Sequence, residues 1–207
     1  MRFKHVPDLR ARGLAGSDGE LPDADRLVAY VAEVQNAVPL VPGTEDDCCA
    51  RLQRRQGFPS RDVSRTWLTF LRAVGLADET DDGFRRTRTE PTVASLRESL
   101  LDGVLGAEEI ATELVDADAT GDTDAERPLT TADGFEAVED LIPRWERTRT
   151  DDWESVWRGR VERLLVWFDV LGLAERVESS DGERGDDEDT AGYVSTDELR
   201  ALLDSRE

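Results

Sequence analysis

The fold of this protein is decided by residues 60–77, which read SRDVSRTWLTFLRAVGLA. Residues 157–174 align with them without a gap, 97 positions later, and read WRGRVERLLVWFDVLGLA. In both copies an amphipathic helix is followed by a glycine and by a short apolar segment with alternating polar residues, so the chain contains a diverged internal repeat. The matched positions are Arg61 with Arg158, Leu68 with Leu165, and Gly75-Leu76-Ala77 with Gly172-Leu173-Ala174.

Three helices are predicted in the first copy from the helical spacing of its apolar residues. Asp23, Thr44 and Ser60 are expected to cap them, because an oxygen-bearing side chain satisfies free N–H groups at a helix start. The second helix would end at Gln56, and the third at Gly75, a residue suited to a left-handed cap. Their buried faces would hold Leu27, Val31, Val34 and Val38 in the first helix, and Val63, Trp67, Phe70, Leu71 and Val74 in the third.

A hairpin is predicted directly after the third helix. Asp81-Asp82-Gly83 lies between two short alternating runs, residues 76–80 and 84–88. An Asp-Gly pair in such a setting favours a β-hairpin. Three helices followed by a tight hairpin resemble a winged helix-turn-helix domain, here over about residues 22–90, after a lead-in segment at 1–21 that is strand-like or loosely ordered.

Residues 91–207 are expected to form a second, larger winged-helix unit. Its predicted wing pairs residues 173–177 with 192–195, and the charged insertion at 179–190 would be a disordered tip. Pro143 is expected to interrupt or restart a helix. The other predicted elements are an extra N-terminal helix at 91–104, a helix at 107–115, an acidic loop at 116–127, a helix with a capping box at Thr130 and Asp133, a long helix at about 152–171 and a short closing helix from Thr196.

The predicted fold class is therefore mostly α with small β-hairpin wings (α+β), arranged as two winged helix-turn-helix units in tandem. The whole pattern resembles tandem winged-helix proteins of halophilic archaea that carry transcription-regulator-like domains. That resemblance implies binding of double-stranded DNA and a role in gene control.

The charge of the chain is extreme and uneven. Its 207 residues include 47 acidic and 26 basic ones, and Lys4 is the only lysine. We interpret this balance as adaptation to a high-salt cytoplasm, because screening at molar salt lowers the cost of dense like charge. The net charge is −1 over residues 1–90 and −20 over residues 91–207.

Arginines cluster in the first copy against this acidic background. Between residues 51 and 72 there are six arginines and a single acid, Asp62. Arg61, Arg65 and Arg72 share one stripe of the third helix, which in a winged helix enters the DNA major groove. The guanidinium fork can bind guanine or phosphate bidentately. The candidate DNA-binding residues are Arg51, Arg54, Arg55, Arg61, Arg65 and Arg72, together with Arg85, Arg86 and Arg88 of the wing.

A packing role for the same stripe is the alternative. Leu68 lies within it, and the second copy has Glu162 and Asp169 where the first has Arg65 and Arg72. If the two third helices packed antiparallel, Leu68 would meet Leu165, and opposite charges would face each other. The second unit, with its apolar long helix and four tryptophans, would then be an interaction or dimerisation module, for this chain or a partner protein.

The sequence offers no catalytic site, cofactor motif or metal site. Neither a Walker nor a dinucleotide glycine pattern occurs, and His5 is the sole histidine. Cys48 and Cys49 are adjacent, so we expect two reduced, buried thiols in a cytoplasmic protein. No apolar run is long enough to span a membrane. We therefore expect a non-enzymatic protein without cofactors.

Overall fold

A computed structural model describes residues 5–10, 14, 21–119, 128–178 and 191–206. The chain divides into two compact units, unit 1 at Met1–Leu105 and unit 2 at Gly106–Glu207. In both units the described residues are mostly helical and include a two-stranded antiparallel sheet. The predicted insertion at 179–190 and most of the predicted acidic loop, residues 120–127, lie outside the described residues.

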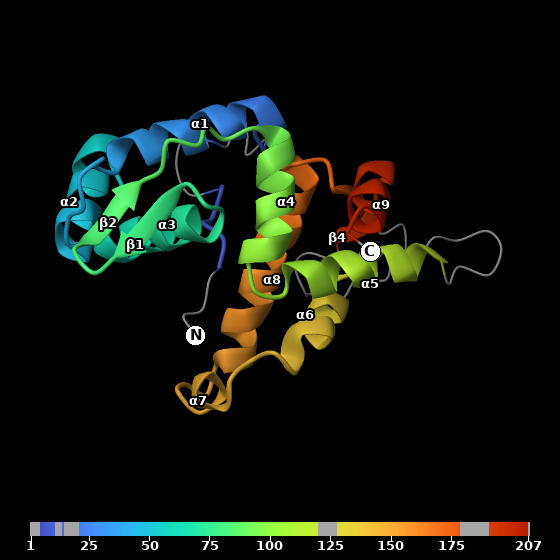
Figure 1. Ribbon diagram of the computed structural model, residues 1–207. Coiled ribbons are helices and arrows are strands. Elements are labelled where there is room, and N and C mark those ends of the chain that lie inside the picture. Colours follow the sequence, from blue (N-terminus) through green and yellow to red (C-terminus); the bar gives the residue numbers. More distant parts are fainter. Residues whose placement is uncertain (1–4, 11–13, 15–20, 120–127, 179–190, 207) are drawn as a thin grey trace. The chain divides into compact units, whose positions relative to one another are not determined.

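Unit 1 has the predicted order of three helices and a hairpin (Figure 1). The predicted caps are confirmed: Asp23, Thr44 and Ser60 each accept a hydrogen bond from a backbone N–H three residues later. The elements are α1 (Ala24–Ala37), α2 (Glu45–Gln56), α3 (Arg61–Ala73), β1 (Ala77–Thr80), β2 (Gly83–Arg86) and α4 (Val93–Gly103).

The hairpin of unit 1 turns one residue earlier than its Asp-Gly pair suggests. Thr80 pairs with Gly83, so the two loop residues are Asp81 and Asp82, and Gly83 is the first residue of β2. Gly83 has φ +119°, and a Cβ there would lie 2.1 Å from the carbonyl oxygen of Gly43. Glycine is therefore required at position 83, because the β-bridge between Gly43 and Phe84 brings the backbone of Gly43 close to it.

Helix α4 belongs to unit 1, so the prediction that residues 91–104 are part of the second unit is wrong. It begins at a capping box formed by Thr92 and Ser95, and it packs on α1 and α3. The contact with α3 is close: a Cβ on Gly103 would lie 2.0 Å from the carbonyl oxygen of Ala73. Because α4 packs on α1 and α3, it is part of the first winged-helix unit.

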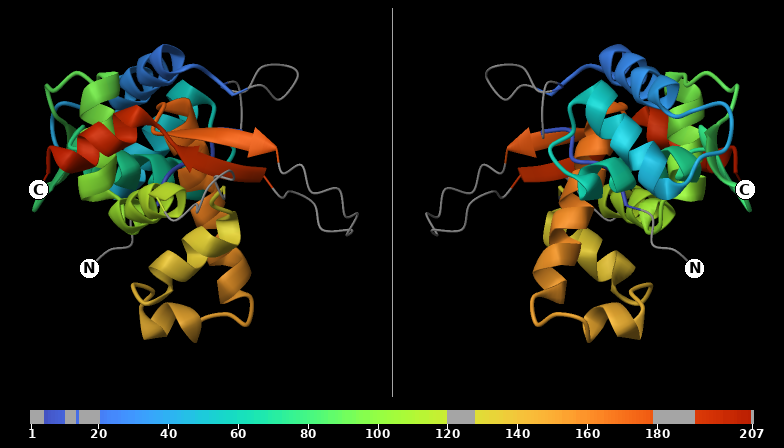
Figure 2. Two further views of the ribbon diagram at one scale, coloured as in Figure 1. Left: turned by 90° about the vertical axis from the view of Figure 1, so that its right-hand side faces the viewer. Right: turned by 90° about the vertical axis from the view of Figure 1, so that its left-hand side faces the viewer.

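Unit 2 repeats this order with one additional short helix. The capping box at Thr130 and Asp133 is confirmed, and Pro143 is the N-cap at which a short helix restarts. Helix α5 runs to Ala119, four residues beyond its predicted end. The elements are α5 (Ala107–Ala119), α6 (Thr131–Glu139), α7 (Arg144–Arg147), α8 (Trp153–Val170), β3 (Ala174–Glu178), β4 (Ala191–Ser195) and α9 (Asp197–Asp204); Figure 2 shows the β3–β4 hairpin and its neighbours.

The two units share the same hydrogen bonds at the junction of helix and wing. Gly75 and Gly172 have φ of +72° and +68°. The next residue in each case, Leu76 or Leu173, donates its N–H to a carbonyl five residues earlier, at 2.8 Å in both units. The hydroxyls of Thr87 and Thr196 then donate to the glycine carbonyls at 3.0 and 2.9 Å. The repeat predicted from sequence is thus a repeat of backbone geometry.

The wings are anchored in the same way in both units. Phe84 of β2 exchanges two backbone hydrogen bonds with Gly43, and Tyr193 of β4 does so with Leu129. Gly43 and Leu129 each directly precede the threonine that is the N-cap of the second helix of their unit. Helix α9 follows the second wing as α4 follows the first, so the counterpart of α4 is the closing helix of unit 2.

The described residues of the lead-in segment include three that pack in the core. Val6, Leu9 and Leu14 are buried, and His5 lies 3.4 Å from the hydroxyl of Thr66. Its described residues, 5–10, 14 and 21, form neither helix nor strand, so the strand-like alternative is wrong for them.

Candidate nucleic-acid interface

The first two turns of α3 present two exposed arginines. Arg61 and Arg65 are each 47% exposed and stand four residues apart, so they lie on one face of the helix. Ser60 starts the helix, and the buried Trp67 and Phe70 fix its opposite face in the core. Stacking of Trp67 on Phe58, with ring centroids 5.9 Å apart, holds the turn between α2 and α3. The predicted outward direction of the stripe is therefore confirmed at its N-terminal end.

Acids of α2 neutralise these two arginines. Arg61 forms an ion pair with Asp46, and the Nε of Arg65 lies 2.9 Å from a carboxylate oxygen of Glu45. Asp62 adds a third carboxylate, 3.6 Å from Arg65. The hydrogen bond and charge of Glu45 raise the pKa of the Arg65 guanidinium. The guanidiniums are thus held in place, but by carboxylates that occupy donors a phosphate or base would need.

The C-terminal end of the stripe is covered, contrary to expectation. Leu68 is buried, and Arg72 is only 19% exposed because it forms an ion pair with Glu79 of β1. That pair links α3 to the wing. Arg72 is therefore a structural residue in unit 1.

The α2 arginines divide into two kinds. Arg51 is half-buried and donates from Nε to the carbonyl of Ala37 at 2.7 Å, so it satisfies the C-terminus of α1. Arg54 and Arg55 lie exposed in the last turn of α2. Arg54 and Arg55 are therefore the more available cations, and Arg51 has a role within the fold.

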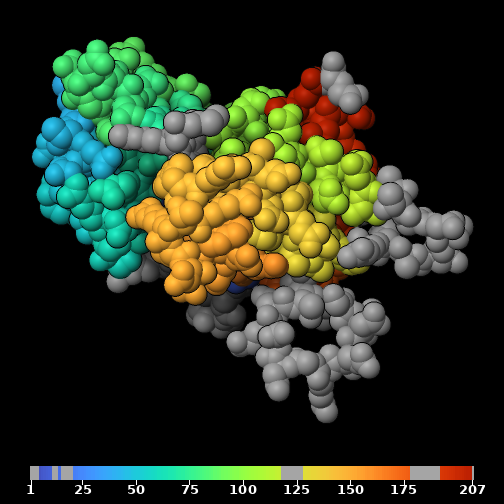
Figure 3. All heavy atoms as spheres, turned by 90° about the horizontal axis from the view of Figure 1, so that it is seen from below, coloured from blue at the N-terminus to red at the C-terminus, as the bar shows by residue number. Residues whose placement is uncertain are grey.

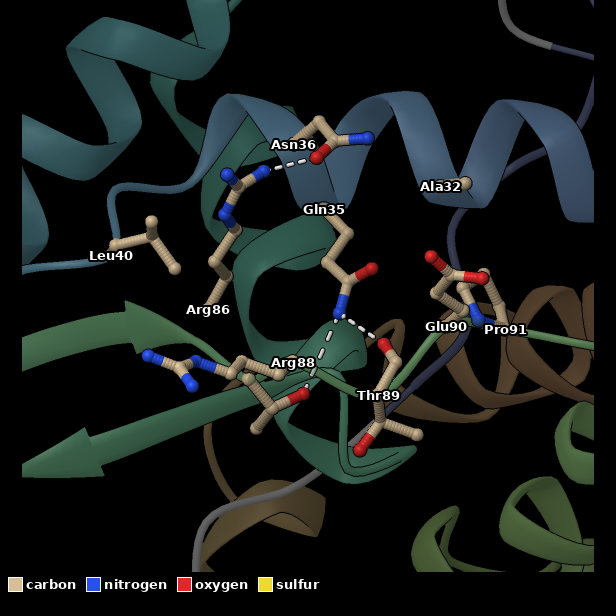
Figure 4. Close-up of a pocket in the computed structure, with 10 residues that line it drawn as sticks. Ala32, Gln35, Asn36, Leu40, Arg86, Arg88, Thr89, Glu90 and Pro91 are labelled. Atoms are coloured by element: carbon tan, nitrogen blue, oxygen red, sulfur yellow. Dashed lines mark hydrogen bonds between the residues drawn. The ribbon is translucent and has the colours of Figure 1, made fainter.

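The wing arginines face in different directions. Arg85 is exposed and lies 3.5 Å from Asp78, its cross-strand partner. Arg86 follows it on the opposite face of the hairpin and donates to the side-chain oxygen of Asn36 in α1. Arg88 lies beyond the strand and lines a groove beside α1 together with Arg86 (Figure 4). Within the wing, only Arg85 therefore remains a candidate for DNA contact on the outer face.

Unit 2 uses its matching positions differently. Arg158, the counterpart of Arg61, lies over the ring of Phe135 at 4.7 Å, a cation–π contact within the unit. Glu162 and Asp169, the counterparts of Arg65 and Arg72, are half-buried, and burial raises the pKa of Asp169. Leu165 is buried, like Leu68. Packing of Leu68 on Leu165 stays a prediction, while Arg65 and Arg72 find acids inside unit 1.

The segment between α6 and α8 exposes Trp145, one of the four tryptophans for which core or interface packing is predicted. Trp145 of α7 is 55% exposed, and Leu141 and Val156 on either side of it in sequence are exposed as well. Arg144 and Arg149 are exposed in the same segment. Figure 3 shows this part of unit 2, coloured orange, on one face of the molecule. The helical spacing of the tryptophans predicts core or interface packing, and Trp145, which follows the break at Pro143, lies outside the core.

The described part of the chain holds no group of three or more histidine, cysteine or acidic side chains arranged for a metal ion. Among the described helices, none has the length and apolar character needed to cross a bilayer.

The two hairpin-bearing units agree with a comparison to known families. Residues 19–188 match the model of the halobacterial double winged helix domain. The chain belongs to that family. No curated protein and no solved structure matches the chain. Winged-helix domains are typically non-enzymatic. Some of them bind DNA and others bind proteins. Membership in the halobacterial double winged helix family therefore establishes the fold and not the ligand.

Proposed function

We propose that this protein is a DNA-binding transcription regulator that contacts double-stranded DNA through unit 1. The observation that carries the proposal is the exposed pair Arg61 and Arg65 on the first two turns of α3, the part of a recognition helix that reaches base edges. Arg54, Arg55 and Arg85 are exposed cations that would bind phosphates beside it.

The ion pairs of Arg61 and Arg65 are compatible with this role. Exposed ion pairs contribute about 0–1 kcal/mol each, so exchange of a carboxylate for a base edge is inexpensive. A bidentate contact of arginine with guanine contributes roughly 1–3 kcal/mol of discrimination. Asp46 and Glu45 would repel phosphates, and this favours base recognition over non-specific binding.

High salt makes base recognition more important still. Phosphate contacts lose affinity steeply as salt rises, because counterion release no longer favours binding. A regulator in molar potassium therefore depends on hydrogen bonds to bases, for which Arg61 and Arg65 are the best placed side chains. We place this activity in the cytoplasm, where the free cysteines Cys48 and Cys49 stay reduced.

The test is selection of DNA sequences by the full chain in molar KCl, followed by titration of the selected duplex. The variant Arg61→Ala/Arg65→Ala should bind that duplex at least tenfold more weakly, since two base contacts are lost. Arg144→Ala/Arg149→Ala removes the same charge from unit 2 and should bind like the wild type. Failure to select any sequence, or equal binding by both variants, would refute the proposal.

A protein-interaction role for unit 2 is the second candidate, and the exposed Trp145 favours it. Tryptophan is enriched among the residues that dominate interface energies, and a solvent-facing tryptophan in a stretch of sequence with other exposed apolar residues indicates an interaction surface. We propose that this surface joins two copies of the chain. Sedimentation equilibrium in molar KCl should detect a dimer that Trp145→Asp dissociates; a monomer at every concentration would exclude it.

A further inference from the structure

A groove in unit 1 lies between α1 and the segment that leaves the wing. It has a volume of about 420 Å³, within the range of small-ligand sites. Figure 4 shows α1 along one side of it and residues 86–91 along the other. Seven of its ten lining residues are polar or charged, and neither the fold nor the proposed DNA contact uses this space. The residues that line it are Ala32, Gln35, Asn36, Leu40, Arg86, Thr87, Arg88, Thr89, Glu90 and Pro91.

Gln35 is a buried polar side chain at the floor of the groove. It is only 5% exposed, and its amide nitrogen donates to the carbonyls of Thr89 at 2.8 Å and Leu76 at 3.1 Å. These bonds fix the orientation of the amide, so its oxygen points away from them into the groove (Figure 4). No donor among the described residues reaches that oxygen. The oxygen is accessible from the groove, and an amide oxygen without a protein donor is a position where a ligand N–H can be bound.

The charges around the groove are separated. Arg86 and Arg88 lie toward the Leu40 end, whereas Glu90 lies beside Ala32 (Figure 4). Within the described part of unit 1, Arg88 and Glu90 have no ion-pair partner. In Figure 4 the amide oxygen of Gln35 points toward the Glu90 end and adds a second acceptor to the groove. One end of the groove therefore suits a carboxylate and the other an ammonium group.

The length of the groove limits the ligand. Asn36, which binds Arg86, is four residues from Ala32, or about 6 Å along the axis of α1. The guanidinium groups extend this separation toward Leu40, which is 56% exposed at the rim. A single amino acid is too short to span the two ends, whereas an extended tripeptide covers about 10 Å.

We propose that this groove binds a short zwitterionic peptide, with its carboxylate at Arg86 and Arg88 and its ammonium group at Glu90 and the Gln35 amide oxygen. Leu40 would contact an apolar side chain of the peptide. Because Gln35 also holds Leu76, the first residue after the glycine that ends α3, a bound peptide would contact the junction between α3 and the wing. The site is independent of the proposed DNA contact.

The proposal is tested by titrating the full chain with trialanine in molar KCl and measuring the chemical shifts of the backbone amides at each step. Shifts should localise to residues 32–40 and 86–91. N-acetylated trialanine and the C-terminal amide should each bind about tenfold more weakly, since each lacks one charged end. Arg88→Ala should abolish the preference for a free carboxylate, and Glu90→Gln the preference for a free amine. Arg54→Ala, a surface arginine outside the groove, is the matched control.

Three outcomes would overturn the proposal. They are no localised shift with trialanine, equal binding of all three peptides, and equal binding by Arg88→Ala and Arg54→Ala. If both blocked peptides bound as tightly as trialanine, the groove would be a surface that accepts apolar groups without charge recognition. Loss of DNA binding has no bearing on the result, because no DNA is present.

Discussion

The two adjacent cysteines are buried thiols held in their neutral form. Cys48 lies within 3.6–3.7 Å of the carbonyls of Gly43 and Phe84, the two residues of the β-bridge. Burial raises the pKa of Cys48, and burial together with the charge of Glu45 raises the pKa of Cys49 to about 11. The adjacent pair thus has the environment of core residues rather than of redox-active thiolates.

The raised thiol pKa predicts a loss of stability at alkaline pH. Below the pKa of the unfolded thiol, about 8.5, both states hold the proton and stability is complete. As pH rises toward the folded pKa of about 11, only the unfolded state releases the proton, so the free energy of unfolding falls. Denaturant unfolding between these pH values should show a smaller fall for Cys49→Ala than for the wild type. Identical slopes would contradict the assigned cause.

Glycine is essential at one wing position and dispensable in a helix. Gly83→Ala should destabilise the protein by several kcal/mol, because its Cβ would overlap the backbone of Gly43 and its φ is positive. Gly159→Ala should stabilise α8 by about 0.5–1 kcal/mol, since nothing lies within 4 Å of a Cβ there. Thermal unfolding of both variants tests the two predictions. If Gly83→Ala unfolded at the same temperature as the wild type, β2 would have to move away from Gly43.

At the scale of elements, local signals predicted nearly every helix. Side-chain caps and periodicity depend on residues a few positions apart, so Thr44, Ser60 and Thr130 could be assigned from sequence. The assignment of α4 could not, because it rests on packing against α1 and α3. The candidate site was also predicted only in part. The spacing of Arg61 and Arg65 predicted that they lie on one face of α3, but the acids that pair with them belong to the preceding helix and were not predicted.

The N-terminus of α2 is expected to control how readily α3 binds DNA. Glu45→Gln/Asp46→Asn removes the carboxylates that pair with Arg65 and Arg61, and it also removes repulsion of phosphates. The variant should bind random-sequence DNA several-fold more tightly than the wild type, and its affinity should fall more steeply with salt. Glu98→Gln/Asp102→Asn makes the same charge change on α4 and is the control. If the two variants bind random DNA equally, Glu45 and Asp46 have no such role.

At the scale of the whole molecule, the two units differ strongly in net charge, as the two parts of the sequence do. Unit 1 carries a net charge of −2 and unit 2 a net charge of −19, over nearly equal lengths. Repulsion among like charges destabilises a compact state and weakens when salt shortens the screening length from about 10 Å at 0.1 M to about 3 Å at 1 M. Unit 2 should therefore gain far more from salt than unit 1.

Amide hydrogen exchange of the full chain, followed unit by unit across a KCl series, measures that difference. Protection of core amides in α8 should rise steeply with KCl, whereas protection in α3 should change little, because only unit 2 has a large repulsion to relieve. Sucrose strengthens burial in both units without screening charge, so it should raise protection in both alike. An equal response of α3 and α8 to KCl would mean that salt acts through burial of apolar surface. The acidic surface of unit 2 would then have no part in its stability at high salt.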